Sequence, residues 1–462
     1  MSNLLKYSIT LFITLFALAG CAVESDSLQE QVKFETKEAW DAYRTYAWGH
    51  DILRPVTESY DDWYDEPLFI SPIDAYSTLA IMGLDEDAAE IESYVTDSLS
   101  FDKDLYVKTF EMNIRVLGGL LSMYHLSENK RVLEKAKDFG DRLMKAYDSP
   151  TGIPYYWVNL KTGETRRDSV NVAEAATNLI EMGVLSYYTG DPAYYQAAKR
   201  AANAIFDRRS ELDLTHEFID VETGEWLDEY AHIGAKIDSY YEYLYKAWLL
   251  FGDDDLLDMW ETHIPAIEEH IKVEEGNDQW YPVVNAVTGE IITHQVSLWD
   301  AYFPALLKIS GHDESARKTM YTWDRIWNKH GLVPMFYNVK EDSITGPRYV
   351  LNPEVIESAY YMWHFTEEQQ YHDMLQTYFS DLKEYCKTPS GGYSSVADVR
   401  TKEKDDEMPT FFFAETMKYL YLGFGGAPEY GLDEVVFSTE AHPFVKSRFD
   451  REQVRQNLGL EM

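Results

Sequence analysis

From Glu35 onward, apolar residues recur along the chain at steps of three and four rather than in alternation. A nearly all-apolar run at 116–121 is followed by a polar break at 128–130, and then by apolar residues at helical spacing between Val132 and Leu143. Such spacing places the apolar side chains of the second segment on one face of a helix. The pattern predicts a buried helix followed by an amphipathic helix that packs against it.

The same plan recurs along the chain, with short polar turns between the helices. These turns lie roughly 55–65 residues apart, which is too long for tetratricopeptide units. Paired helices with one nearly all-apolar member predict a closed ring in which inner helices are buried against outer helices. No Pro-, Gly- or Ser-rich linker divides residues 35–462, so we predict one large all-α domain. The turns are Thr189–Pro192, Phe251–Asp254, Ser310–Asp313 and Thr366–Glu368.

Two polar segments interrupt the helical pattern. Residues 159–164 and 285–290 are short and each contains a glycine. Such segments are typical of β-hairpins. We therefore expect short β-hairpins at the mouth of the ring.

The first residues predict export. Residues 1–20 carry Lys6 and an apolar run that is too short to span a bilayer comfortably. The run closes on Leu-Ala-Gly-Cys21, which resembles a bacterial lipobox. We expect residues 1–20 to be a lipoprotein signal peptide, Cys21 to carry the lipid, and residues 21–34 to be a tether. The alternative is a plain signal peptide with an incidental cysteine.

The expected location follows from the residue after the cysteine. Ala22, rather than Asp, favours the outer membrane in a Gram-negative bacterium. We therefore expect an exported bacterial lipoprotein of the outer membrane that contacts the membrane only through the lipid on Cys21.

Composition narrows the range of partners. Asp and Glu number 80 against 41 Lys and Arg, which gives a formal net charge of −39. This balance argues against nucleic acid or an anionic membrane surface as a partner, because both need a basic face. Two cysteines exclude a disulfide framework and a Cys-rich metal site. Aromatic residues make up 15% of the chain and argue against disorder.

Acidic residues that interrupt apolar helical segments are the candidate chemistry. Buried carboxylates are costly unless they are paired, hydrogen-bonded or bound to a metal. Any one of them could be a helix cap or an ion-pair partner. Several together, flanked by aromatic residues, suit a sugar, whose hydroxyls need acceptors and whose ring faces need flat apolar surfaces. The set is Glu111, Glu181, Asp238, Glu242, Glu354, Glu357 and Glu415.

Eight segments carry a more specific signal: Ala47–Pro55, Ile73–Leu79, Phe110–Arg115, Gly152–Tyr155, Gly234–Leu244, Pro353–Ser358, Phe411–Leu420 and Phe437–Pro443. In this order they resemble glycoside hydrolase family 47, the class I α-1,2-mannosidases, together with the degradation-enhancing mannosidase-like proteins. The resemblance implies an (α/α)7 barrel. It also implies an exo-acting, inverting, calcium-dependent α-mannosidase that removes mannose, α-1,2-linked in this family, from oligosaccharides or N-glycan-type mannans.

The same resemblance assigns roles to individual residues. Glu111 matches the general acid and Glu354 the general base. Asp238 matches a third essential acid, which is an alternative proton donor. The expected substrate-binding residues are Asp74, Arg115, Glu181, Glu242 and Phe411.

The expected cofactor is one Ca²⁺ ion. By the resemblance, Thr439 binds it directly, and Glu357 and Glu415 orient its waters. A hard cation prefers oxygen ligands and tolerates several waters, so this donor set is chemically reasonable. The ion would coordinate vicinal hydroxyls of the mannose and help to distort its ring.

The sequence departs from the family pattern in four places. Asn352 replaces the usual Arg, Ser77 an Asp, and Met335 a pocket Glu. Residues 296–304 replace a His-Leu-x-Cys-Phe segment and are closer to the degradation-enhancing branch. Since the proposed acid, base and calcium threonine are retained, we expect Met335 and Asn352 to alter substrate choice rather than to abolish catalysis.

Two other functions remain open at this stage. One is a non-catalytic, calcium-dependent surface lipoprotein that binds mannose glycans. The other is a helical lipoprotein that captures oligosaccharides for a transporter. Retention of Glu111, Asp238 and Glu354 favours the enzyme.

Overall fold

The computed structural model describes residues 27–460. The expected signal peptide and the lipidated Cys21 lie outside the described residues. Within residues 27–460, no helix combines the length and the apolar character that crossing a membrane requires.

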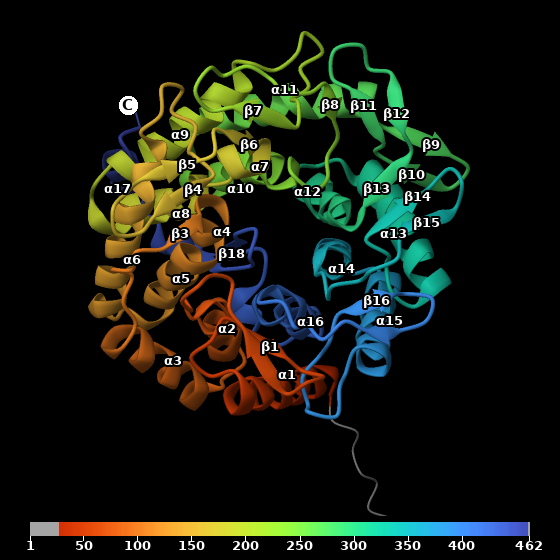
Figure 1. Cartoon of the computed structure of the whole chain (residues 1–462). Helices are drawn as coiled ribbons and strands as arrows, with labels where there is room; N and C mark the ends of the chain where they lie inside the picture. Colours follow the sequence, from red (N-terminus) through yellow and green to blue (C-terminus); the bar gives the residue numbers. More distant parts are fainter. Residues whose placement is uncertain (1–26, 461–462) are drawn as a thin grey trace, which may run out of the picture.

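Over the described residues, seven inner helices alternate along the chain with seven outer helices and form a closed ring (Figure 1). The fold is an (α/α)7 barrel, as expected. The inner helices are α2 (Ile70–Ile81), α5 (Gly118–Ser127), α8 (Leu179–Thr189), α10 (Asp238–Phe251), α12 (Phe303–Ile309), α14 (Glu354–Thr366) and α16 (Met417–Gly423). The outer helices are α1 (Leu28–Tyr46), α3 (Asp85–Asp97), α6 (Lys130–Leu143), α9 (Ala193–Phe206), α11 (Asp254–His270), α13 (Asp313–His330) and α15 (Gln369–Tyr385).

Burial separates the two rings as the apolar pattern predicts. Inner helix α8 is buried at every position from Leu179 to Tyr187. Outer helix α6 buries Val132, Ala136, Phe139, Gly140 and Leu143, which recur at helical spacing on one face. The inner ring therefore packs on both sides, whereas the outer ring keeps a polar face for solvent.

The predicted turns end the inner helices. Gly190 (φ 73°) follows α8 and Gly252 (φ 69°) follows α10, both with the left-handed backbone that glycine adopts without strain. Glu367 (φ 55°) ends α14 in the same conformation. Each outer helix can therefore start immediately after its inner partner.

The two ends of the described chain close the ring. Outer helix α1 packs against α16, and α2 packs against the π-helical turn η4 (Phe412–Thr416). Thr78 donates a hydrogen bond to the Phe413 carbonyl at 2.7 Å. The expected tether at 21–34 is wrong in its second half, because α1 begins at Leu28 and buries Val32 in the core. Residues 28–34 belong to the barrel.

Short antiparallel β-structures cover one end of the ring, which we call the mouth (Figure 1). The predicted hairpins are confirmed, since residues 159–164 join β4 to β5 and residues 285–290 join β11 to β12. Three-stranded sheets are β3 (Tyr106–Lys108), β4 (Trp157–Asn159) and β5 (Thr165–Arg166); β8 (Tyr230–Ala231), β11 (Val283–Asn285) and β12 (Ile291–Thr293); and β13 (Gln295–Ser297), β14 (Phe336–Asn338) and β15 (Ser343–Gly346). Two-stranded pairs are β1 (Ile52–Arg54) with β2 (Ser59–Asp61), β6 (Ser169–Asn171) with β7 (Phe218–Asp220), β9 (Val273–Glu275) with β10 (Asp278–Trp280), and β16 (Val396–Asp398) with β17 (Glu403–Lys404).

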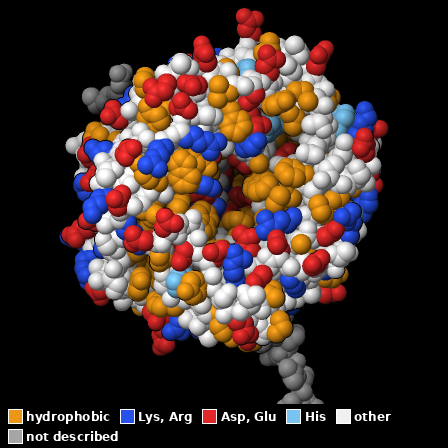
Figure 2. Space-filling model, viewed as in Figure 1, with side chains coloured by type: hydrophobic (Ala, Val, Ile, Leu, Met, Phe, Trp, Pro, Cys, Tyr) orange, Lys and Arg blue, Asp and Glu red, His pale blue; other side chains and the backbone are white. Residues whose placement is uncertain are grey.

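One hairpin differs from these and enters the ring. Strands β18 (Val435–Phe437) and β19 (Pro443–Val445) pair antiparallel, and the turn between them, residues 438–442, is largely buried inside the barrel. The last described helix, α17 (Arg451–Leu458), follows this hairpin and packs against α8. Viewed from the mouth, the centre of the ring is hollow, with acidic side chains at its depth and hydrophobic and basic side chains around its rim (Figure 2).

Candidate active site

A cavity of about 240 Å³ lies inside the ring at the mouth end. Its walls are the first turns of the inner helices, and its floor is the turn at 438–442. Nine of the residues assigned from the sequence line it: Glu111, Arg115, Asp238, Glu242, Glu354, Glu357, Phe411, Glu415 and Thr439.

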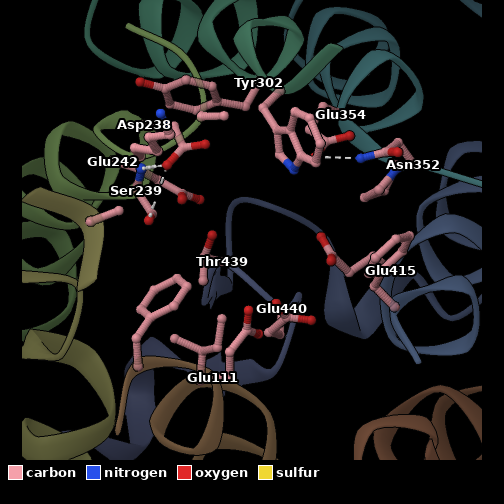
Figure 3. A pocket seen from close by; sticks show the side chains of 18 of the residues that line it. Glu111, Asp238, Ser239, Glu242, Tyr302, Asn352, Glu354, Glu415, Thr439 and Glu440 are labelled. Carbon is pink, nitrogen blue, oxygen red and sulfur yellow. Dashed lines mark hydrogen bonds between the residues drawn. The ribbon is translucent and has the colours of Figure 1, made fainter. Parts of the chain in front are cut away.

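The three candidate catalytic carboxylates stand where inner helical segments begin. Glu111 ends the short helix α4 (Thr109–Glu111) before the π-helical turn η1 (Met112–Leu117). Asp238 is the first residue of α10, and Glu354 is the first residue of α14. Figure 3 shows Glu111 on one side of the cavity, Asp238 and Glu354 on the other, and Thr439 between them.

Burial alters the acidity of two of these groups. Desolvation raises the pKa of Asp238 to about 8, although the Ser239 backbone N–H, 2.8 Å from Oδ1, acts in the opposite direction. Desolvation also raises the pKa of Glu354 to about 8, and a hydrogen bond from Asn352 opposes that rise. Titratable groups with strongly raised pKa values in one cavity are typical of acid–base catalysis.

Arg115 connects the wall of the cavity to its floor. Its Nε donates to Glu111 Oε2 at 3.0 Å, and its Nη1 donates to Thr410 Oγ1 at 3.2 Å and to Glu440. The guanidinium also lies over the Phe411 ring, 5.6 Å from its centroid. Arg115 is thus held in place from several sides and can present a fixed positive charge to the cavity.

A buried lysine links the deeper carboxylates. Lys246 donates to Glu242 and lies 3.3 Å from Glu357 Oε1, and Tyr419 donates to the same oxygen at 3.2 Å. Burial raises the pKa of Glu357 to about 7, against the effect of Lys246. Sequence analysis missed Lys246, although its position four residues after Glu242 on an apolar helix was the available signal.

Two buried acids, Glu415 beside the floor and Glu440 within it, have strongly perturbed acidity. Burial raises the pKa values of Glu415 and Glu440 well above the usual range; the charge of Glu440 adds to the rise for Glu415, and the charge of Asp74 adds to the rise for Glu440. Arg115 partly offsets this for both. Sequence analysis gave Glu440 no role, although it follows Thr439 in the closing motif.

Thr439 is positioned from behind by a chain of hydrogen bonds. Its backbone N–H donates to the Tyr243 hydroxyl at 3.2 Å, and this hydroxyl donates to Glu181 Oε1 at 2.6 Å. Asn113 donates to the other oxygen of Glu181 at 3.1 Å. Glu181 is fully buried and does not line the cavity, so its expected contact with substrate is corrected to support of the floor.

Asp74 also lies behind the cavity rather than in its wall. It is fully buried, with Oδ1 3.2 Å from His442 Nε2 and Oδ2 3.6 Å from Arg115 Nη1. Gly118 permits this arrangement, because a Cβ there would lie 2.8 Å from His442 Cδ2. Asp74 therefore contacts His442 and Arg115 from beneath the site. This corrects its expected role in direct sugar binding.

Strained backbone flanks the candidate site. Lys236 (φ 86°), Leu351 (φ 63°) and Ala441 (φ 51°) have left-handed conformations that non-glycine residues rarely adopt. They lie within three residues of Asp238, Glu354 and Glu440 respectively. Such strain persists only where the surrounding structure enforces it, and it concentrates at functional sites.

The residues at the floor offer oxygen donors to a cation. Within the described chain, the Thr439 hydroxyl makes no hydrogen bond to protein, and Figure 3 shows it pointing into the cavity. Residues 27–460 contain no group of three or more His, Cys, Asp or Glu side chains arranged to hold a metal by themselves. A cation here would depend on Thr439, water and substrate oxygens, with the acids around it, and that donor set suits a hard ion such as Ca²⁺.

The sequence departures fall in different places. Asn352 lines the cavity and donates to Glu354 Oε1 at 3.2 Å. Trp299, from the replaced segment, also lines it. Met335 does not, so its expected place in the pocket is wrong, and Ser77 does not line the cavity either. Ser77 is buried and accepts a hydrogen bond from Lys418 at 2.9 Å.

Sequence comparison relates the chain to known proteins. The pattern of Glycosyl hydrolase family 47 matches residues 35–446. An α-mannosidase I of Arabidopsis thaliana is 34% identical over 468 residues, covering 95% of this chain and 80% of the relative. The ER degradation-enhancing alpha-mannosidase-like protein 2 of Homo sapiens is 32% identical over 460 residues, which cover 92% of this chain and 78% of the relative.

A solved structure shares the fold. The α-1,2-mannosidase from Trichoderma reesei superimposes with a TM-score of 0.82 at 25% identity, covering 90% of this chain and 98% of that one. The two chains therefore share their fold over nearly their whole length.

Proposed function

Because the chain belongs to glycosyl hydrolase family 47 and is an α-mannosidase by that membership, we propose that it is an exo-acting, inverting, calcium-dependent enzyme that releases α-1,2-linked mannose from oligosaccharides. The observation that carries this proposal is the arrangement of Glu111, Asp238 and Glu354 around Thr439 at the bottom of one cavity.

Glu354 is the general base in this proposal. An inverting enzyme needs one carboxylate to activate water on the face of the sugar opposite the leaving group. Glu354 lies across the cavity from Glu111, and its Oε2 has no hydrogen-bond partner within the described chain. That oxygen is available to accept a proton from water.

Asp238 is better suited than Glu111 to donate the proton to the leaving group. Burial raises the pKa values of Asp238 and Glu354 alike, to about 8; in this proposal Asp238 keeps its proton, whereas Glu354, whose ionised form the Asn352 hydrogen bond stabilises, loses it. Glu111 instead accepts a hydrogen bond from the Arg115 guanidinium at 3.0 Å, which engages one of its carboxylate oxygens. Of the two donors that the sequence left open, we therefore assign Asp238, with Glu111 orienting Arg115 and binding substrate or solvent.

The shape of the site supports attack from the end of a glycan. The turn at 438–442 fills the barrel below the cavity, so a sugar chain can enter only from the mouth. A terminal mannose would reach Thr439, with the rest of the glycan extending toward the hairpins. Phe411 and Arg115 line the path and offer an apolar face and a hydrogen-bond donor.

Calcium is assigned to the floor. Thr439 would ligate it directly, and Glu357 and Glu415 would orient its waters. When bound, the ion would supply positive charge to vicinal hydroxyls of the mannose and stabilise a distorted ring. The raised pKa values of Glu415 and Glu440 support the assignment, because acids crowded without enough positive charge are stabilised by a cation.

The proposed location is the outer membrane, through a lipid on Cys21. The support is the Leu-Ala-Gly-Cys sequence after a short apolar run, followed by Ala22. The barrel begins at Leu28, so only a few residues would separate the anchor from the enzyme.

The test of the proposed function is the product released from α-1,2-mannobiose in the presence of Ca²⁺. We expect free mannose, and proton NMR of the first product should show the β-anomer. Glu354→Gln should lower turnover by roughly 10²–10⁴, while the same change at the exposed Glu261 on α11 should not. An α-anomer formed first would refute inversion, and mannobiose binding without mannose release would favour the non-catalytic glycan-binding protein.

A further inference from the structure

One wall of the cavity carries an aromatic side chain that the proposed mechanism does not use. Trp299 is the second residue of η3 (Leu298–Tyr302), the short helical turn that leads into inner helix α12. It is half-buried and lines the cavity. Among the described residues, we find no ring–ring contact, cation–π contact or hydrogen-bond partner for Trp299.

Trp299 differs in this respect from the other aromatic residue assigned to sugar binding. The Phe411 ring is already covered on one side by the Arg115 guanidinium, at 5.6 Å from the centroid. A half-buried indole that lines a cavity and has an unpartnered donor exposes part of its apolar surface to the cavity, which is unfavourable in water unless a ligand covers it. Trp299 therefore has the properties of a binding surface.

Its height in the barrel shows which part of a ligand it meets. The inner helices begin at the mouth, so residues in their first turn lie at one level and residues one turn later lie deeper. Trp299 stands in a first turn, as do Asp238 and Glu354, whereas Glu242 and Glu357 lie deeper and Thr439 lies at the floor.

The wall that carries Trp299 is joined directly to the helix that carries Glu354. η3 packs against α14, and the Ser358 hydroxyl on α14 donates to the Ala301 carbonyl on η3. The Ala305 backbone N–H donates back to Ser358 Oγ at 3.1 Å. Trp299 is therefore held at a fixed position relative to Glu354.

We propose that Trp299 is the specificity-determining platform on which the sugar ring of the leaving group stacks, next to the mannose that is released. This inference rests on the proposed function. A mannose on the floor at Thr439 places the scissile bond at the level of the carboxylates, so the next ring lies at or above the level of Trp299. The apolar face of that ring packs on the indole, and one of its hydroxyls accepts from the indole N–H.

The substrate class that follows is a glycan with a hexose ring directly beyond the terminal mannose. A small leaving group gains nothing from Trp299, because it does not reach the indole. The platform acts by binding the leaving group and takes no part in proton transfer, so its loss should change the discrimination between leaving groups.

The test compares two substrates that differ only in the leaving group: α-1,2-mannobiose and α-mannosyl fluoride. Trp299→Ala should lower kcat/KM for mannobiose about tenfold, mainly through KM, since a lost aromatic stacking contact is worth roughly 1.4 kcal/mol. The kcat/KM of Trp299→Ala for α-mannosyl fluoride should stay near the value for the parent protein. Trp299→Phe keeps a flat ring without the N–H. Its kcat/KM for mannobiose should lie between those of Trp299→Ala and the parent.

Binding provides a second readout that does not need turnover. Mannobiose should change the intrinsic fluorescence of the Glu354→Gln protein, and adding Trp299→Phe should remove most of that change. Trp363→Phe, at the far end of α14 where the ring contacts His372, is the matched control and should leave it intact.

Two results would overturn the inference. One is an equal loss of kcat/KM for both substrates in Trp299→Ala with an unchanged Tm, which would mean that the indole supports the whole site. The other is no loss for either substrate. Failure of the proposed function looks different: the parent would then release no mannose from either compound, while the fluorescence comparison would still decide whether Trp299 contacts the sugar.

Discussion

The side-chain amide of Asn352 donates a hydrogen bond through Nδ2 to Oε1 of Glu354, at 3.2 Å. Asn352 is almost fully buried, and its own Oδ1 has no partner within the described residues. The contact stabilises the ionised form of Glu354 and so lowers its pKa, against the larger effect of burial. Since a general base acts in its ionised form, Asn352 makes Glu354 usable closer to neutral pH.

The first prediction follows from that contact. Asn352→Leu removes the donor, so the pKa of Glu354 should rise above about 8 and the acidic limb of the kcat/KM profile should move to higher pH by about one pH unit. Asn352→Asp should move it in the same direction, because a nearby like charge disfavours ionisation. The measurement is kcat/KM for α-1,2-mannobiose between pH 5 and pH 9. A uniform loss of activity with an unmoved limb would contradict the assignment.

The second prediction concerns calcium and Thr439. Ca²⁺ should raise the Tm of the protein, because a ligand that binds only the folded state stabilises it by about 2.7 kcal/mol at 100 times its Kd. Thr439→Val keeps the shape of the side chain but removes the hydroxyl, so the rise should largely disappear. Thr366→Val, at the end of α14 where the hydroxyl bonds the Met362 carbonyl, is the control and should keep the rise.

Differential scanning calorimetry with Ca²⁺ or with EDTA measures this effect independently of catalysis. An equal Ca²⁺-dependent rise in Thr439→Val and the parent would place the ion elsewhere. No rise in the parent would remove calcium from the proposal.

The barrel could be predicted from the sequence because burial sets its pattern. Inner helices such as α8 are apolar on every side, and outer helices such as α6 are apolar on one face, so the pairing is visible in the order of residues. The boundary of the domain was harder to place. The first turns of α1 are mostly polar and bury few side chains, Val32 among them, so residues 28–34 have the composition of a tether.

The site could be predicted only in part, because sequence shows that an acid interrupts an apolar helix but not which way it faces. Glu242 and Glu181 look alike in the sequence, yet Glu242 lines the cavity and Glu181 supports Tyr243 behind it. Glu440 and Lys246 were missed for a related reason. Their importance comes from the partners that the fold brings to them, Arg115 and Glu357, which are distant in sequence.

The third prediction concerns attachment to the membrane. Cys21→Ser should abolish lipidation and move the protein to the soluble fraction, because the lipid is attached through that thiol. Mass spectrometry of the mature N-terminus and membrane fractionation measure the outcome. Ala22→Asp is the matched variant: it should keep the lipid and change which membrane of a Gram-negative host holds the protein. Unchanged fractionation of Cys21→Ser would point to a different anchor.

The last prediction uses the buried carboxyl of Glu181. Desolvation raises its pKa in the folded protein to about 8, from 4.5 as the ordinary value, so the folded state binds this proton more tightly than the unfolded state does. Stability therefore falls as pH rises from about 4.5 to about 8, where the unfolded chain loses the proton first. The contribution amounts to a few kcal/mol, since each pKa unit corresponds to about 1.4 kcal/mol.

Glu181→Gln removes that dependence and keeps an oxygen to accept from Tyr243, while Asn113 can turn its unpartnered Oδ1 toward the new amide. The variant should be similar to the parent or slightly less stable at pH 5 and clearly more stable at pH 8, with the difference in Tm growing steadily between them. Glu261→Gln, on the exposed face of α11, should show a difference in Tm that does not change with pH. If the Tm difference for Glu181→Gln also did not change with pH, Glu181 would be ionised in the folded protein throughout this range. A positive charge close to it, such as a cation at the floor beyond Tyr243, would then have to stabilise the carboxylate.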